Sequence, residues 1–116
     1  MAEGSVPVTE PGGALQILTL KYAKGRLAAP HYHIPHQRET GGLQECFIVI
    51  RGRIRVFFFD DQGESVTHAD FAAGETCLVL DGPHAIRFLE DSEVLEVKNG
   101  PFFDDKRFLS ITDPLE

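Results

Sequence analysis

The sequence predicts an all-β fold: a sandwich, a jelly roll or a barrel. Short apolar runs recur along the chain, separated by turn signals at roughly eight-to-twelve-residue spacing, as in small all-β domains. No long segment repeats its apolar residues with the 3.6-residue period of an amphipathic helix. Helix is therefore expected at most as one turn within residues 104–109.

The expected elements follow in chain order. Residues 1–13 hold prolines and glycines without a periodic apolar pattern, which predicts a flexible N-terminal arm. Residues 14–23 form a strand candidate with imperfect alternation, and residues 45–61 hold two apolar runs. Residues 65–100 hold about four more short strands. The sequence DDQG at 60–63 has the Asp and Gly chemistry of a hairpin turn.

Length and composition limit the class of protein. The 116 residues suit one compact domain, which we assign to residues 14–116. The formal charge of −7 disfavours a nucleic-acid partner, because phosphate binding depends on clustered Lys and Arg. No apolar run reaches the roughly 20 residues that cross a bilayer, and the N-terminal sequence does not resemble a secretory signal. We therefore expect a cytoplasmic protein that binds neither nucleic acid nor membrane.

The two cysteines, Cys46 and Cys77, are too few for a disulfide framework. Both lie in apolar runs, where a free cysteine usually behaves as a small buried hydrophobe. Buried thiols are therefore favoured over a redox pair.

The strand expected at residues 45–50 is apolar on both faces. Five of its six residues are apolar, so both faces are expected to be covered. A small jelly roll has one interior, so the second face needs the N-terminal arm, a C-terminal segment or a partner subunit. A homodimer is the simplest answer.

Four side chains form the main candidate for chemistry. His31 and His33 are two residues apart, so on an extended strand their imidazoles lie on the same face. Glu45 begins a later strand, and His84 follows the bend DGP. Together they would make a mixed N/O site for a divalent transition metal such as Fe, Mn, Ni, Zn or Cu. A polar loop, with a Lys or Arg as the partner of Glu45, is the alternative.

Residues 25–52 resemble the first signature motif of the cupins, which has a glycine, His-x-His, a glutamate and a second glycine. The matching positions are Gly25, His31, His33, Glu45 and Gly52. The second cupin motif is matched loosely by Gly74, Gly82 and His84. The resemblance implies an RmlC-like double-stranded β-helix, the cupin jelly roll. It also implies a metal inside the barrel, with His31, His33, Glu45 and His84 as ligands.

The chain departs from the common cupin spacing in one loop. Eleven residues separate His33 from Glu45, so His36 or Gln37 could replace one of the expected ligands. This insertion and the ending LEVKNGPFFDDKRF look like a subgroup of small bacterial cupins, the WbuC-like proteins. That subgroup is associated with surface-polysaccharide biosynthesis, which implies a sugar or nucleotide-sugar as the metabolite.

Two further groups of residues are candidates for a functional role. His36 and Arg38 lie in the inserted loop, where they could contact an anionic or hydroxylated substrate or face solvent. Glu96 and Lys98 share a strand face, and an ordinary ion pair is favoured over acid/base catalysis.

Three functions remain open from the sequence. The first is a metal-dependent enzyme on a small polar metabolite, either an isomerase or epimerase or a dioxygenase. The second is a cupin that binds its ligand without turnover. The third is a metal-free sugar epimerase or ketoisomerase, which would need a His with a carboxylate partner and a Tyr. Tyr22 and Tyr32 are the candidates for that Tyr.

Overall fold

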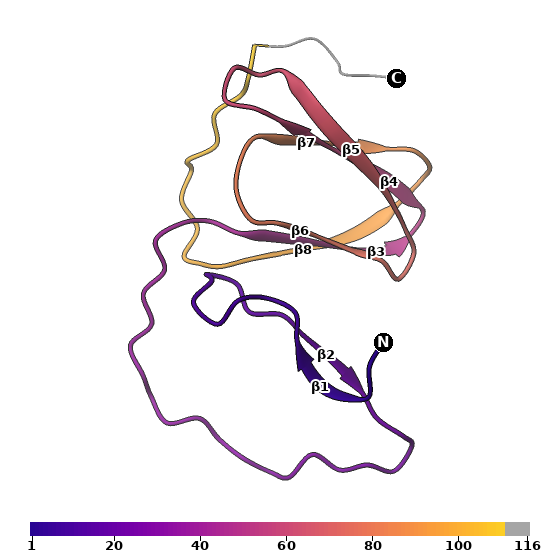
Figure 1. Cartoon of the computed structure of the whole chain (residues 1–116), viewed down its shortest axis with the longest axis vertical. Coiled ribbons are helices and arrows are strands. Elements are labelled where there is room, and N and C mark those ends of the chain that lie inside the picture. The colour runs from indigo at the N-terminus through magenta and orange to yellow at the C-terminus, as the bar shows by residue number, and fades with distance from the viewer. Residues whose placement is uncertain (111–116) are drawn as a thin grey trace. The chain divides into compact units, whose positions relative to one another are not determined.

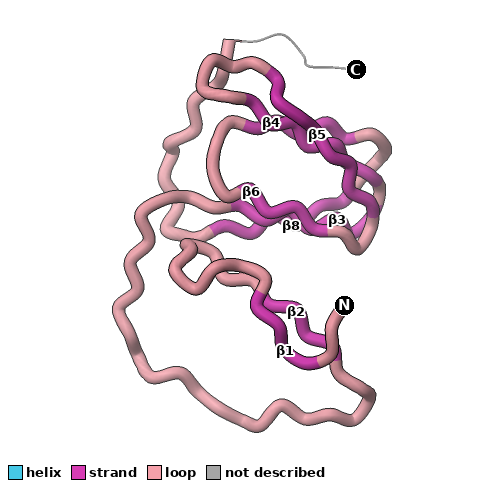
Figure 2. The backbone as a smooth tube through the Cα atoms, in the orientation of Figure 1, coloured by secondary structure: helices cyan, strands magenta, loops and turns pink. Residues whose placement is uncertain are grey.

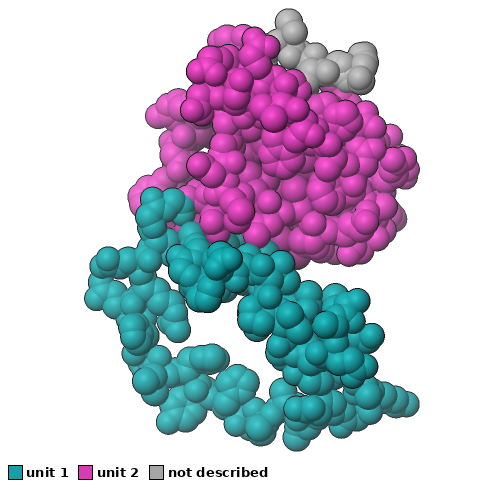
Figure 3. All heavy atoms as spheres, in the orientation of Figure 1, with its two compact units in different colours: residues 1–42 teal, residues 43–116 magenta. Residues whose placement is uncertain are grey.

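The computed structural model describes residues 1–110, and this part of the chain contains strands, turns and loops but no helix (Figure 1). The predicted all-β fold is confirmed. The chain divides into two compact units, residues 1–42 and 43–116, and each is described by itself (Figure 3). The flexible arm over residues 1–13 and the single domain over residues 14–116 stay predictions. Within the described residues, no helix has the length and apolar character needed to cross a membrane.

The first unit contains one antiparallel strand pair, β1 (Gly4–Pro7) with β2 (Leu18–Lys21). The segment between the strands is held by the side chain of Gln16, whose Nε2 donates to the carbonyls of Glu10, Pro11 and Gly13. No residue in 1–42 is fully buried. From residue 22 to residue 44 the chain is a long loop without a strand (Figure 2).

The second unit contains six strands in two antiparallel sheets. The strands are β3 (Glu45–Arg51), β4 (Arg53–Phe59), β5 (Ser65–Ala72), β6 (Thr76–Val79), β7 (His84–Phe88) and β8 (Glu93–Lys98). One sheet has the order β6-β3-β8 and the other β5-β4-β7. The two sheets face each other as layers (Figure 1). The two runs predicted over residues 45–61 and the four strands over residues 65–100 are confirmed.

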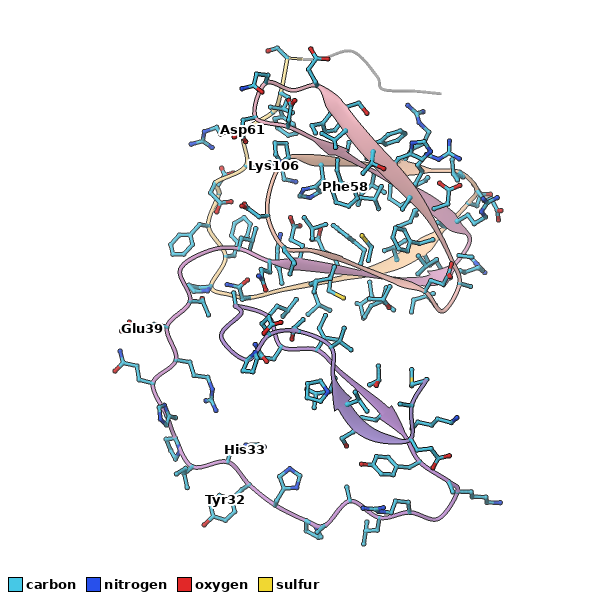
Figure 4. The ribbon with its side chains drawn as sticks, in the orientation of Figure 1. Tyr32, His33, Glu39, Phe58, Asp61 and Lys106 are labelled. Atoms are coloured by element: carbon cyan, nitrogen blue, oxygen red, sulfur yellow. The ribbon has the colours of Figure 1, made fainter. Side chains whose placement is uncertain are left out.

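The core lies between these two sheets. Alternate residues of each central strand point inward, because successive side chains of a strand lie on opposite faces. Phe58 extends this inner row on β4 (Figure 4). The buried cluster consists of Phe47 and Val49 of β3, Ile54 and Val56 of β4, and Cys77 and Val79 of β6.

The central strands of the two sheets are joined through a single residue, Gly52. Its φ is +91°, in the left-handed region that glycine adopts without strain. A Cβ at this position would lie 2.6 Å from the Asp91 carbonyl oxygen and 2.8 Å from Ser92 Cα. Ser92 Oγ accepts a hydrogen bond from Arg53 N at 3.2 Å. The backbone that crosses between the sheets therefore packs directly against the turn that joins β7 and β8.

The turn predicted at residues 60–63 is confirmed as the connection between β4 and β5. Asp60 Oδ1 accepts hydrogen bonds from the backbone N–H groups of Gln62 at 3.0 Å and Glu64 at 2.9 Å. An aspartate that binds backbone N–H groups a few residues ahead is a recurrent way to stabilise such turns. The two strands that this turn joins pair from Phe59 with Ser65 to Arg53 with Ala72.

The outer faces of the two sheets differ in chemistry. The outer face of β6-β3-β8 is apolar across all three strands, through Ile48, Ile50, Leu78, Leu95 and Val97. The outer face of β5-β4-β7 carries a charged cluster, in which Arg55 contacts Asp70 at 2.6 and 2.9 Å and Arg53 contacts it at 3.1 Å. The hydrogen bond from Arg55, together with the charges of Arg55 and Arg53, holds the pKa of the Asp70 carboxyl below its usual value.

Both cysteines are free and buried, which confirms the sequence prediction. Burial raises the pKa of the Cys46 thiol and that of the Cys77 thiol. Both thiols are therefore protonated at neutral pH, and the thiol is the less reactive form of cysteine.

We predict that Gly52→Ala lowers the free energy of unfolding by about 2 to 4 kcal/mol. The alanine would be strained in the left-handed backbone conformation, and its methyl group would also clash with Asp91 and Ser92. Gly74→Ala is the matched control, because Gly74 has a φ of +86° but nothing within 4 Å of its Cβ position. The control should lose only about 1 to 2 kcal/mol of backbone strain. Urea unfolding followed by circular dichroism measures both variants, and equal losses would contradict the close approach at Gly52.

We also predict that the Asp70 ion pair makes stability depend on pH. Because the folded-state pKa of Asp70 lies below its unfolded value, the contribution is complete above the unfolded pKa of about 4. It is lost as the pH falls through the folded-state pKa. Asp70→Asn should therefore lower the melting temperature at pH 7, and the gap to wild type should close below about pH 4.

Asp61→Asn is the control for this experiment, since Asp61 is an exposed carboxylate in the turn next to β4 (Figure 4). Its melting temperature should follow the wild-type curve at every pH. A gap between Asp70→Asn and wild type that stays constant from pH 7 to about pH 3 would contradict the ion-pair account.

Candidate functional site

Glu45 and His84 meet between the two sheets of the second unit. Glu45 is the first residue of β3, and His84 is the first residue of β7 in the other sheet. Glu45 lies on the inward face of β3 with Phe47, and His84 pairs with the inward residue Phe58. His84 Nε2 lies 3.2 Å from Glu45 Oε1, with the side chains 23% and 14% exposed. The contact therefore joins the two layers at one end of the core.

The bend Asp81–Pro83 positions the imidazole. Gly82 has a φ of +94°, and its N–H donates to Asp81 Oδ1 at 2.8 Å. The carbonyl of Pro83 accepts from Phe59 N at 3.0 Å, which ties the bend to the end of β4. His84 Nδ1 lies 3.1 Å from the carbonyl oxygen of Gly82. The orientation of the ring is thus set by local backbone geometry.

Glu45 is positioned by the sheet around it. On its inward face the directly opposite residues are Val79 of β6 and Lys98 of β8. Immediately before it, Gln44 N donates to Asn99 Oδ1 at 2.9 Å, which fixes the entry of β3 against the exit of β8. The ring of Phe47 lies beside the imidazole of His84, with centroids 6.2 Å apart.

The protons of the pair are assigned from the neighbours of each ring nitrogen. A carbonyl oxygen can only accept, so Nδ1 of His84 donates its proton to Gly82. In a neutral imidazole Nε2 is then an acceptor, and an ionised Glu45 is also an acceptor. Two acceptors at 3.2 Å repel each other unless a cation lies between them. Either a second ring proton or a metal ion satisfies this requirement.

The spacing of the two donor atoms fits a shared metal ion. Two ligands about 2.1 Å from one ion, at a mutual angle of about 90° to 109°, lie roughly 3.0 to 3.4 Å apart. The observed separation of 3.2 Å falls in this interval. A ligating histidine also commonly donates its other ring N–H to a backbone carbonyl, as His84 does. The chemistry of the donor set therefore suits a transition metal, while the spacing is equally that of an ordinary hydrogen bond.

The other two predicted ligands, His31 and His33, lie in the long loop of the first unit, where Figure 4 labels His33. Their ring centroids are 5.3 Å apart, and His31 Nδ1 donates to the carbonyl of Ala29 at 2.8 Å. Within residues 1–110, no group of three or more His, Cys, Asp or Glu side chains is close enough to hold a metal ion. The second unit brings together two of the four predicted ligands, Glu45 and His84. The complete four-ligand site stays a prediction.

His36 and Arg38, the predicted substrate-binding residues, lie in the same exposed loop as His33. His36 Nδ1 donates to the carbonyl of Gln37 at 3.0 Å, and Arg38 Nη1 donates to the carbonyl of His36 at 3.4 Å. Both side chains therefore hydrogen-bond to backbone carbonyls of their own loop. Their role towards a substrate stays a prediction.

The structure adds Lys98 to the surroundings of Glu45. The sequence favours an ordinary ion pair between Glu96 and Lys98, and that pair is present at 3.4 Å. The register places Lys98 directly opposite Glu45 and Glu96 directly opposite Phe47. Directly opposite residues share a face, so this ion pair lies on the side of the sheet that holds the site. Sequence alternation groups Glu96 with Lys98, but it does not identify the strand they pair with.

The fold and the site define an all-β protein with two facing antiparallel sheets and a histidine–carboxylate pair between them. The chain belongs to the family described as Domain of unknown function (DUF6016), whose model matches residues 9–71. This range includes His31, His33 and Glu45 and ends before His84. No curated protein and no solved structure matches the chain significantly.

Proposed function

We propose that this chain is a small metal-binding cupin that binds or acts on a small polar metabolite. The observation that carries the proposal is the 3.2 Å contact between His84 Nε2 and Glu45 Oε1, which brings an imidazole nitrogen and a carboxylate oxygen, both common metal ligands, to one point between the sheets. Two facing antiparallel sheets with the pair at one end of the core support a double-stranded β-helix. The cupin-like sequence of residues 25–52 points to the same fold.

The proposed ion is a divalent transition metal: Fe, Mn, Ni, Zn or Cu. Glu45 and His84 would hold it, and His31 and His33 are the two further ligands that the sequence motif implies. When bound, such an ion polarises a carbonyl or hydroxyl oxygen of the metabolite. A sugar or nucleotide-sugar follows from the WbuC-like resemblance, with isomerisation or epimerisation and dioxygenation as the reaction classes.

A second candidate function uses the same pair without a metal. A histidine with a carboxylate partner can serve as a general base in an epimerase or ketoisomerase, with a proton instead of a metal ion between the two atoms. Such chemistry also calls for a tyrosine. The Tyr22 hydroxyl is 2.6 Å from Ser5 Oγ, and Tyr32 is 87% exposed, so neither has the buried setting of a catalytic acid. The metal-dependent function is therefore the better supported.

Metal content tests the proposal directly. Protein purified without chelator or added metal should hold about one ion per chain by elemental analysis. Glu45→Gln and His84→Ala should each lower the bound metal at least tenfold, since removing a ligand costs more than the roughly 10–100-fold loss seen for outer-shell partners. His31→Ala and His33→Ala test the two ligands that the motif implies.

His68→Ala is the matched control, because His68 is an exposed histidine on β5, paired with Phe57 of β4. It should leave the metal content unchanged. Metal below about a tenth of an ion per chain, unaffected by either Glu45→Gln or His84→Ala, would exclude the metal site and favour the second candidate.

We also propose that the chain forms a homodimer through the outer face of the β6-β3-β8 sheet. Support comes from the apolar side chains across that face, among which Ile50 is 59% exposed, Leu95 52% and Val97 40%. Contiguous exposed apolar area of this kind marks interaction surfaces on proteins. The exposed Arg51–Glu93 ion pair lies at the end of the same sheet. In a two-fold symmetric dimer, each of these charges would be able to pair with the opposite charge of the second copy.

Light scattering after size exclusion measures the assembly. The wild-type chain should have twice the chain mass, and Leu95→Glu should shift it to the monomer, because a buried unpaired carboxylate is costly. Val66→Glu is the control, since Val66 is 64% exposed on β5 in the other sheet. A wild-type protein that stays monomeric at concentrations up to about 100 μM would contradict the dimer.

A further inference from the structure

The outer face of the β5-β4-β7 sheet is shielded from water at its centre. Phe57 lies on this face, because its neighbours on β4 point into the core, and it is only 4% exposed. Its ring contacts His68, which is itself exposed, and the residue opposite on β7 is Ala85, which is too small to cover a phenyl ring. The Nε atom of Arg87, on the same face of β7, is also buried. Further atoms must therefore lie over this face.

This face is also rich in arginine. Arg53 and Arg55 of β4 share one carboxylate, that of Asp70 on β5. Arg87 of β7 lies directly opposite Arg55, and like charges in that position destabilise a sheet. Three arginines thus stand against one aspartate on the outer face of these three strands. A segment with both acidic and apolar side chains matches this charge and the buried ring of Phe57.

The chain itself approaches this face after β8. Figure 1 shows residues 101–110 leaving the end of β8 and running past the edge of the sandwich to the level of the β5-β4-β7 sheet. Figure 4 labels Lys106 at that level. Every residue from 101 to 110 is exposed, so this stretch does not itself pack closely over Phe57. The next residues along the chain are 111–116.

Residues 111–116, with the sequence ITDPLE, have the chemistry that matches this face. They carry the carboxylates of Asp113 and Glu116, the aliphatic side chains of Ile111 and Leu115, and no basic residue. Six extended residues span at most about 20 Å, whereas the two edge strands of a three-stranded sheet lie about 10 Å apart. The segment is therefore long enough to cross all three strands.

We propose that residues 111–116 dock across the outer face of the β5-β4-β7 sheet of the same chain, with a carboxylate paired with Arg87 and aliphatic side chains over Phe57. The docking is independent of the proposed metal and of the proposed dimer. β7 is an edge strand that begins with His84 and contains Arg87. Docking at Arg87 thus braces the strand that positions the imidazole of His84, which links residues 111–116 to the candidate site.

Hydrogen exchange of the full chain, followed by mass spectrometry, tests the docking. The double variant Asp113→Lys with Glu116→Lys presents like charge to Arg87, so backbone exchange in residues 84–88 should become about threefold faster or more. Adding Arg87→Glu to this variant exchanges the two charges. Exchange should then return to within about twofold of the wild type.

Asp104→Lys with Asp105→Lys is the matched control, because it makes the same change of charge in the exposed stretch before residue 111. It should leave the exchange of residues 84–88 as in the wild type. The proposal is overturned if reversing the charges of Asp113 and Glu116 does not change this exchange, or if the control speeds it equally.

The same measurement distinguishes two other occupants of the face. If residues 111–116 of a second copy cover it, protection of residues 84–88 should rise with protein concentration between about 1 and 100 μM. The titration is repeated with Leu95→Glu, so that the proposed dimer does not affect it. If a separate acidic partner covers the face, charge reversal has no effect on the isolated chain. Either result contradicts docking within one chain, whereas protection that is independent of concentration supports it.

Discussion

The close backbone crossing at Gly52 is the constraint on which the second unit depends. It joins β3 and β4, the central strands of two different sheets, through one residue. The backbone at this residue packs closely against Asp91 and Ser92. Because side chains alternate along a strand, fixing this crossing fixes which residues of both strands face inward. Val49 and Ile54 thus enter the core on either side of the crossing, and Glu45 faces inward with them at the far end of β3.

The site pairs a fixed backbone bend with a close contact between two ionisable side chains. The bend at Gly82 holds the imidazole of His84 so that Nε2 faces the carboxylate of Glu45. A proton on Nε2 makes this contact an ordinary hydrogen bond from the imidazole to the carboxylate. Lys98 lies opposite Glu45 in the sheet register and forms an ion pair with Glu96.

The two sheets use their outer faces differently. One outer face combines the charged cluster of Arg53, Arg55 and Asp70 with the buried ring of Phe57. The other outer face is apolar on every strand, as the alternation of residues 45–50 predicted. Sheets that are apolar on both faces are usually covered by other structure on both faces. The two sheets therefore differ in the chemistry of their outer faces.

The sequence by itself determined the all-β class, the strands after residue 44, the turn at residues 60–63 and the burial of both thiols. These features depend on local alternation and turn chemistry, which a linear pattern carries. It also singled out Glu45 and His84, through their place in a motif. Only the tertiary structure decided that these two side chains meet across the core and that Lys98 lies opposite Glu45. Sheet order and register arise from packing between distant segments, and residue spacing along the chain does not encode them.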